Sequence, residues 1–195
     1  MVRVTLTDVA RHCGVSRSTV SLVVNNSPLV SAATAARVRQ AMTDLGYVYN
    51  RAAASLRTHR SNAIGVVLPQ VSSSYFAEFA AGLHDALAGS DSVALLTVSG
   101  EDRDLQRRQL QSLVERNVDG IVLVPAAGST AADLPGLPDT PLVLALRPLP
   151  GASADYVGGA EGDGTGAGRG AREAGRHAAR LVLARASAPV RPRTR

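Results

Sequence analysis

Residues 5–26 of the chain read TLTDVARHCGVSRSTVSLVVNN. Within this stretch, Val9 and Cys13 are spaced as residues on one face of a first helix. Gly14 follows where the chain must turn sharply, and glycine tolerates the left-handed conformation that often ends a helix. Ser16 stands where its hydroxyl can cap the start of a second helix. The stretch predicts a DNA-binding helix-turn-helix, and the alternative is a helical hairpin with no such function.

A third helix is predicted directly after this motif. It should run from Ser31 to about Leu45, because Ser31 can cap it and alanine-rich sequence fills it. Val38 and Met42 continue its apolar stripe, and Gly46 is a natural stop. The second helix supplies a matching apolar side from Val15, Val20, Val23 and Val24.

Composition excludes several functional classes. All 21 basic residues are arginine, which excludes chemistry that requires a lysine, as in a P-loop or a Schiff-base enzyme. The single cysteine excludes an intrachain disulfide, and the four histidines form no zinc-site spacing. No apolar run reaches transmembrane length, and the N-terminus lacks the core of a signal peptide. We therefore expect a cytoplasmic protein with no membrane partner, metal or cofactor.

The charge is unevenly distributed along the chain. Residues 1–60 carry eight arginines against two acidic residues, whereas residues 61–150 carry five against ten. Residues 151–195 are basic again, with eight arginines against four acids. A basic N-terminal domain beside an acidic middle domain suits a module that meets phosphates, joined to one that does not.

From about residue 62 the pattern changes to alternating strands and helices. Branched, uncharged runs predict buried strands, and amphipathic runs predict the helices between them. Such alternation predicts a parallel, doubly wound sheet. The expected strands are Ala63–Leu68, Ser92–Val98, Gly120–Val124 and Pro141–Leu146, and the expected helices are Tyr75–Ala88 and Asp102–Arg116.

Three segments in order resemble the N-terminal DNA-binding headpiece of the LacI/GalR family of bacterial repressors. They are VTLTDVARHCGVSRSTVS at Val4–Ser21, NNSPLVSAATAARV at Asn25–Val38 and LGYVYNRAAASLR at Leu45–Arg57. VDGIVLVPA at Val118–Ala126 and LRPLPG at Leu146–Gly151 are similar to the first lobe of the family's periplasmic-binding-protein-like core.

The resemblance and the patterning together predict an α/β chain of four parts. A small all-α helix-turn-helix domain (1–49) and a hinge helix or linker (50–60) precede a partial doubly wound lobe (61–150). The remainder, 151–195, is rich in glycine and arginine, with nine of the 18 glycines between residues 151 and 175. We expect this tail to be disordered or frame-shifted and the protein to be a truncated form, or else a divergent member with an unusual tail.

The resemblance assigns base reading to Arg17, Ser18 and Leu22 of the second helix. The Arg17 guanidinium can donate two hydrogen bonds to guanine, one to O6 and one to N7. The alternative is that Arg17 contacts a phosphate or is only solvated. Leu22 departs from the arginine that many relatives carry, and it can make only apolar contact. Small donors near helix starts favour phosphate oxygens, although Ser16 and Ser31 could serve only as caps. The expected phosphate contacts are Thr5, Ser16, Thr19, Ser21, Asn25, Ser31 and Thr34.

Two further sites follow from the resemblance. In the hinge, Leu56 would wedge into the minor groove while Ala53 lets two hinge helices touch, the alternative being a plain linker. Tyr75, Phe76 and Arg147 would line the edge of an effector cleft, although Phe76 is equally suited to the core. Leu146 replaces the acid that usually precedes Arg147 in the family.

The predicted function is a LacI/GalR-type, sequence-specific transcriptional regulator of repressor type, and not an enzyme. The resemblance implies double-stranded, pseudo-palindromic operator DNA as the partner. It leaves a small-molecule effector only possible, because the family's second-lobe effector contacts have no counterparts in this sequence. The family forms homodimers, but the absence of second-lobe sequence makes pairing doubtful here. One alternative is a cytoplasmic sugar- or nucleobase-binding module with a vestigial headpiece. Another is an enzyme on a doubly wound sheet, since that fold supports many activities.

Overall fold

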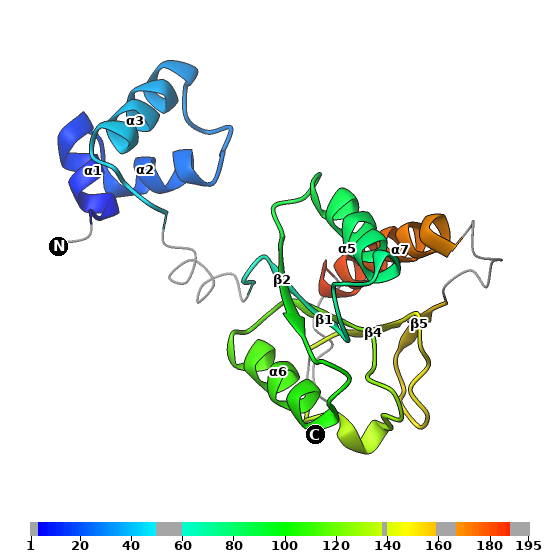
Figure 1. The fold of residues 1–195 in the computed structure, drawn as a ribbon. Helices are drawn as coiled ribbons and strands as arrows, with labels where there is room; N and C mark the ends of the chain where they lie inside the picture. Colours follow the sequence, from blue (N-terminus) through cyan, green and yellow to red (C-terminus); the bar gives the residue numbers. More distant parts are fainter. Residues whose placement is uncertain (1–3, 50–59, 138–139, 159–166, 188–195) are drawn as a thin grey trace. The chain divides into compact units, whose positions relative to one another are not determined.

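The computed structural model describes residues 4–49, 60–137, 140–158 and 167–187 (Figure 1). The chain divides into two compact units, Met1–Ala54 and Ser55–Arg195. Within the described ranges, no helix combines the length and apolar character needed to cross a membrane.

The N-terminal unit consists of three helices, as its sequence predicts. They are α1 (Leu6–Cys13), α2 (Arg17–Val24) and α3 (Ala32–Asp44). Gly14 ends α1 with a φ of 64°, and its N–H donates to the carbonyl of Ala10. The three helices enclose a small core in which Val9, Val20, Val38 and neighbouring small residues are buried.

The second unit is built on a parallel sheet of five strands in the order β2-β1-β3-β4-β5. In its centre, Val66 of β1 pairs with Leu96 of β2 and with Val122 of β3. β1 is buried along its whole length, whereas β2 forms one edge and exposes Val93 and Leu96. The strands are β1 (Ala63–Leu68), β2 (Val93–Val98), β3 (Gly120–Leu123), β4 (Leu142–Ala145) and β5 (Asp155–Val157).

Helices cover both faces of this sheet (Figure 1). On one face, α5 (Ser74–Leu87) and α7 (Ala167–Ser187) pack side by side over a core that includes Phe79. On the other face lie α6 (Arg103–Glu115) and a short 3-10 turn, Ala131–Asp133. The predicted doubly wound α/β fold is confirmed.

The expectation of a structureless tail is wrong for residues 155–157 and 167–187. β5 extends the sheet beyond β4, and α7 packs on α5. The reason is that α7 buries the smallest side chains. Its buried residues include Ala171, Ala174, Ala178 and Ala179, which give little apolar periodicity to a sequence read for large side chains.

Candidate nucleic-acid interface

The three predicted base-reading residues lie together on the outside of α2. Arg17 and Ser18 occupy its first turn and are exposed, and Leu22 follows one turn after Ser18. The opposite side of the helix carries Val20 and Val23, which are buried in the core. The helix is thus anchored by its apolar side and free to present the other side to a partner.

A cluster of hydroxyl groups fixes the start of α2. The Ser16 Oγ accepts the N–H of Thr19 at 3.1 Å, which completes an N-cap. The same oxygen lies 2.6 Å from the Ser18 Oγ and 2.9 Å from the Thr19 Oγ1. The cap therefore also holds the Ser18 side chain, one of the predicted base readers.

Thr5 caps α1 through a reciprocal arrangement with Asp8. The N–H and the hydroxyl of Thr5 both donate to Asp8 Oδ2, at 3.0 and 2.7 Å. These hydrogen bonds, first the hydroxyl and then the backbone N–H, lower the pKa of Asp8 below its ordinary value. Since both donors of Thr5 are used, a phosphate contact from Thr5 would have to replace a hydrogen bond to Asp8.

The other predicted phosphate contacts also take part in local hydrogen bonds. The Ser31 Oγ caps α3 by accepting the Thr34 N–H at 3.3 Å and donates to the Thr34 Oγ1 at 3.0 Å, which leaves the Thr34 hydroxyl hydrogen available. The Asn25 Nδ2 donates to the Ser21 carbonyl at 2.6 Å, just beyond the end of α2. All four side chains are at least partly exposed.

The N-terminal unit exposes further arginines that no sequence motif distinguishes. Arg37 and Arg39 on α3 and Arg11 on α1 are exposed, like Arg17. Their only signal in the sequence is the excess of arginine over acid in residues 1–60. The predicted hinge residues, Ala53 and Leu56, lie outside the described residues.

The three residues predicted at an effector cleft come together in the second unit. The guanidinium carbon of Arg147 stands 5.8 Å from the centre of the Phe76 ring, and Tyr75 meets the same ring edge-on at 5.8 Å. Phe76 is buried, so its core role and its contact with Arg147 hold at once. Burial, and secondarily the nearby Tyr156, raises the pKa of the Tyr75 hydroxyl above its ordinary value.

Glu101, which no sequence motif distinguishes, completes this group. Its two carboxylate oxygens accept from Arg147 Nη1 at 2.8 and 2.9 Å, and one of them also accepts the N–H of Ala127 at 2.8 Å. Glu101, Pro125 and Arg147 follow β2, β3 and β4, so the group lies at the carboxyl edge of the sheet. Ligands of open α/β sheets bind at this edge.

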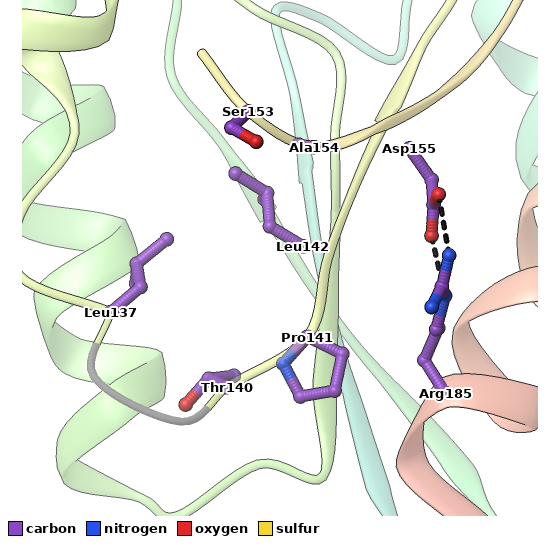
Figure 2. Close-up of a pocket in the computed structure, with 8 residues that line it drawn as sticks. All are labelled: Leu137, Thr140, Pro141, Leu142, Ser153, Ala154, Asp155 and Arg185. Carbon is purple, nitrogen blue, oxygen red and sulfur yellow. Dashed lines mark hydrogen bonds and ion pairs between the residues drawn. The ribbon is translucent and has the colours of Figure 1, made fainter. Parts of the chain in front are cut away.

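A separate hollow of about 550 Å³ lies at the opposite edge, where β4 and β5 begin. Figure 2 shows Leu137, Leu142 and Ser153 around it, with the ion pair between Arg185 and Asp155 at one side. This pair joins the end of α7 to the start of β5 through contacts of 2.7 and 2.8 Å. Among the described residues, no group of histidine, cysteine and carboxylate side chains could hold a metal ion.

Comparison with known proteins identifies the family. Residues 5–50 match the model for bacterial regulatory proteins of the lacI family, and residues 61–138 match that for periplasmic binding proteins and the sugar binding domain of the LacI family. The maltose regulon regulatory protein MalI of Vibrio furnissii is 36% identical over 119 residues, covering 61% of this chain and 87% of that protein. The chain belongs to the LacI family.

Other members are similar over a smaller share of their own length. MalI of Escherichia coli K12 is 39% identical over 128 residues, which is 66% of this LacI-family chain but 37% of that protein. The crystal structure of a LacI-family transcriptional regulator from Silicibacter pomeroyi superposes with a TM-score of 0.65 and 31% identity, over 80% of this chain and 47% of that one. A lac repressor dimer bound to operator and an anti-inducer gives a TM-score of 0.62 and 25% identity, over 74% and 44%.

Proposed function

We propose that this LacI-family chain is a sequence-specific DNA-binding transcriptional regulator of repressor type. The observation that carries the proposal is the exposed side of α2, where Arg17, Ser18 and Leu22 stand opposite a buried valine side. A helix-turn-helix presents this side of its second helix to base edges in the major groove. The operator-bound lac repressor among the similar structures supports the same use of the fold.

In this proposal the residues divide into readers and positioners. Arg17 reads guanine through its planar fork of N–H groups, and Ser18 and Leu22 contact neighbouring bases. Ser16, Thr19, Ser21, Asn25, Ser31 and Thr34 position the helix by donating to phosphates. Thr5 and Ser31 would do so only by giving up a hydrogen bond, Thr5 to Asp8 and Ser31 to the Thr34 hydroxyl. Because one headpiece reads a half-site, a pseudo-palindromic operator would engage two copies of the chain.

Selection from a random DNA pool with the full chain tests the proposal. We expect an enriched sequence whose affinity falls steeply between low and moderate salt, because each neutralised phosphate adds about 0.9 to the logarithmic salt slope. Arg17→Ala should bind this sequence more weakly. Arg108→Ala, which removes an exposed arginine of α6, is the matched control and should not. No enriched sequence, or an affinity indifferent to salt, would contradict the proposal.

The group around Phe76 supports a second role, the binding of a small polar effector such as a sugar or nucleobase. An aromatic ring, a tyrosine hydroxyl, a guanidinium and a carboxylate meet at the carboxyl edge of the sheet. Such a mixture of aromatic side chains and a few polar groups is typical of small-molecule sites. This role is also the core of the alternative in which the chain serves mainly as a ligand-binding module.

Calorimetric titration with a panel of sugars and nucleobases tests the second role. We expect heat of binding from at least one compound and its loss in Glu101→Gln, which removes the carboxylate that holds Arg147. Glu115→Gln, an exposed carboxylate on α6, is the control and should bind as the parent chain does. Equal titration curves for Glu101→Gln and the parent would overturn the assignment.

A further inference from the structure

Leu22 is an exposed apolar side chain that is not packed on the buried core of the N-terminal unit, as far as the structure describes that unit. The half-buried residues Val15, Val24 and Val30 all pack against the core of this unit, but Leu22 is not among the side chains that do so. It remains 36% exposed on a helix whose buried residues, Val20 and Val23, lie on the other side. Its backbone carbonyl accepts the N–H of Ser27, and its isobutyl group stays outside the packed core.

The position of Leu22 puts this apolar group among readers of DNA. Leu22 is four residues after Ser18, so the two side chains lie on the same face of α2, one turn apart. Ser18 is held by the capping hydroxyl of Ser16, 2.6 Å away, which fixes the orientation of this face. Any base edge that meets Ser18 in the major groove therefore brings a neighbouring base pair to Leu22.

A leucine side chain can recognise only one group in the major groove. It has no hydrogen-bond donor or acceptor, so it cannot use the amino, carbonyl and ring-nitrogen groups that distinguish most base pairs. The thymine C5-methyl is the apolar group exposed there. Cytosine offers only a C5–H where thymine carries its methyl, so the apolar contact would be smaller there. Contact with a purine edge would cover polar atoms without satisfying them, which is unfavourable.

We propose that Leu22 reads a thymine methyl group, so that each operator half-site carries a thymine recognised by apolar contact alone. The inference rests on the proposed function, in which α2 enters the major groove. Arg17, in the first turn, is the polar reader of the same helix. The half-site should thus combine a guanine read by hydrogen bonds with a thymine read by its methyl.

Replacing thymine with deoxyuridine isolates this contact, because uracil keeps the pairing edge of thymine and lacks only the methyl group. The operator is first selected with the full chain, and each thymine of the half-site is then replaced singly in synthetic duplexes. We expect one replacement to weaken binding by about fourfold, the effect of exposing one buried methyl group. Leu22→Ala should bind the thymine and uracil duplexes equally.

Leu29→Ala provides the matched control. Leu29 is 83% exposed, lies after the end of α2 and, like Leu22, is absent from the side chains packed on the core. The substitution makes the same chemical change, so it should keep the fourfold preference for thymine at that position even if the overall affinity falls. The duplex series with the unsubstituted chain stands by itself and does not depend on the folding of either variant.

The outcomes separate the inference from the function on which it rests. Tight, salt-dependent binding that is indifferent to every uracil replacement would overturn methyl reading and leave DNA-binding regulation standing. A uracil effect that persists in Leu22→Ala would overturn the assignment to Leu22. Failure to enrich any sequence would overturn the proposed function, and the inference with it.

Discussion

Gly82 on α5 lies so close to Arg172 on α7 that a Cβ atom at Gly82 would collide with the Arg172 carbonyl oxygen. The contact is mirrored at Gly175 of α7, where a Cβ would collide with the carbonyl of Phe79. The two helices approach this closely because each has a glycine where it meets the backbone of the other. The sheet face beneath them is thereby covered by two helices whose axes could not be so close with ordinary side chains between them.

Replacing either glycine should destabilise the second unit. Gly82→Ala and Gly175→Ala force the helices apart, and overpacking of this kind costs roughly 1–3 kcal/mol. The midpoint of urea unfolding, followed by circular dichroism, measures the loss. Gly168→Ala in the same α7 is the control, because its Cβ would meet nothing closer than 3.7 Å. There the higher helix propensity of alanine should leave stability unchanged or improved by up to about 1 kcal/mol.

Asp119 should stabilise the folded second unit by holding the segment that leads into β1. Its carboxylate, only 5% exposed, accepts the N–H and hydroxyl of Ser61 at 2.7 and 3.0 Å and the N–H of Asn62 at 3.0 Å. Asp119→Asn should lower the free energy of unfolding by about 1–3 kcal/mol. The reason is that the side-chain amide places its own N–H groups against donors that need an acceptor. A double-mutant cycle with Ser61→Ala measures the coupling. Independent, additive effects of the two substitutions would show that the pair does not act as a unit.

The stability that Asp85 contributes should be lost in acid. Hydrogen bonds from Arg176 and then Arg172 lower the pKa of Asp85 below its ordinary value. A lowered pKa in the folded state adds stability above the ordinary aspartate pKa of about 4, and this stability disappears as pH falls through the folded value. Unfolding midpoints measured from pH 7 down to pH 2 should therefore decline less in Asp85→Asn than in the parent chain.

Substitution of a base-contacting residue should change the DNA sequence preference, whereas substitution of a phosphate-contacting residue should not. Arg17→Ala should relax the preference at one base position, with a discrimination loss of about 1–3 kcal/mol, because the guanine fork is gone. Asn25→Ala should weaken all sequences to a similar degree, because phosphates carry no sequence information. Sequencing of sites selected with each variant distinguishes the two. Identical preferences for Arg17→Ala and the parent chain would refute the reader assignment.

Much of this architecture is predictable from the sequence, for reasons visible in particular residues. The turn of the helix-turn-helix needs a left-handed residue, and Gly14 supplies it with a φ of 64°. β1 is an uncharged segment rich in branched residues and buried along its whole length, so AIGVVL is readable as a central strand. In α5 the apolar residues Phe76, Phe79, Leu83 and Leu87 recur at helical spacing and are all buried.

What escaped prediction depends on partners that a linear pattern does not contain. Gln106 is a polar residue within α6, yet it is buried, because its carbonyl accepts the Ala126 N–H at 2.7 Å and its amide donates to Ser129 at 3.3 Å. Glu101 acquires its role only when β2 and β4 bring it to Arg147. α7 resembles low-complexity sequence until α5 provides the surface on which glycine and alanine fit.

Because β2 lies at the sheet edge, its backbone amides can reveal whether another strand pairs with it. The N–H groups of Val93 and Ser99 donate to Asn62 and Leu68, so every second amide of the strand points toward β1. The intervening amides of Ala94, Leu96 and Val98 point away from it. In amide hydrogen exchange, the strand should alternate between slow and fast residues. If a second chain added a strand at this edge, hydrogen exchange would slow at the amides of Ala94, Leu96 and Val98 alone. The pattern of slowed residues would therefore reveal where the added strand pairs.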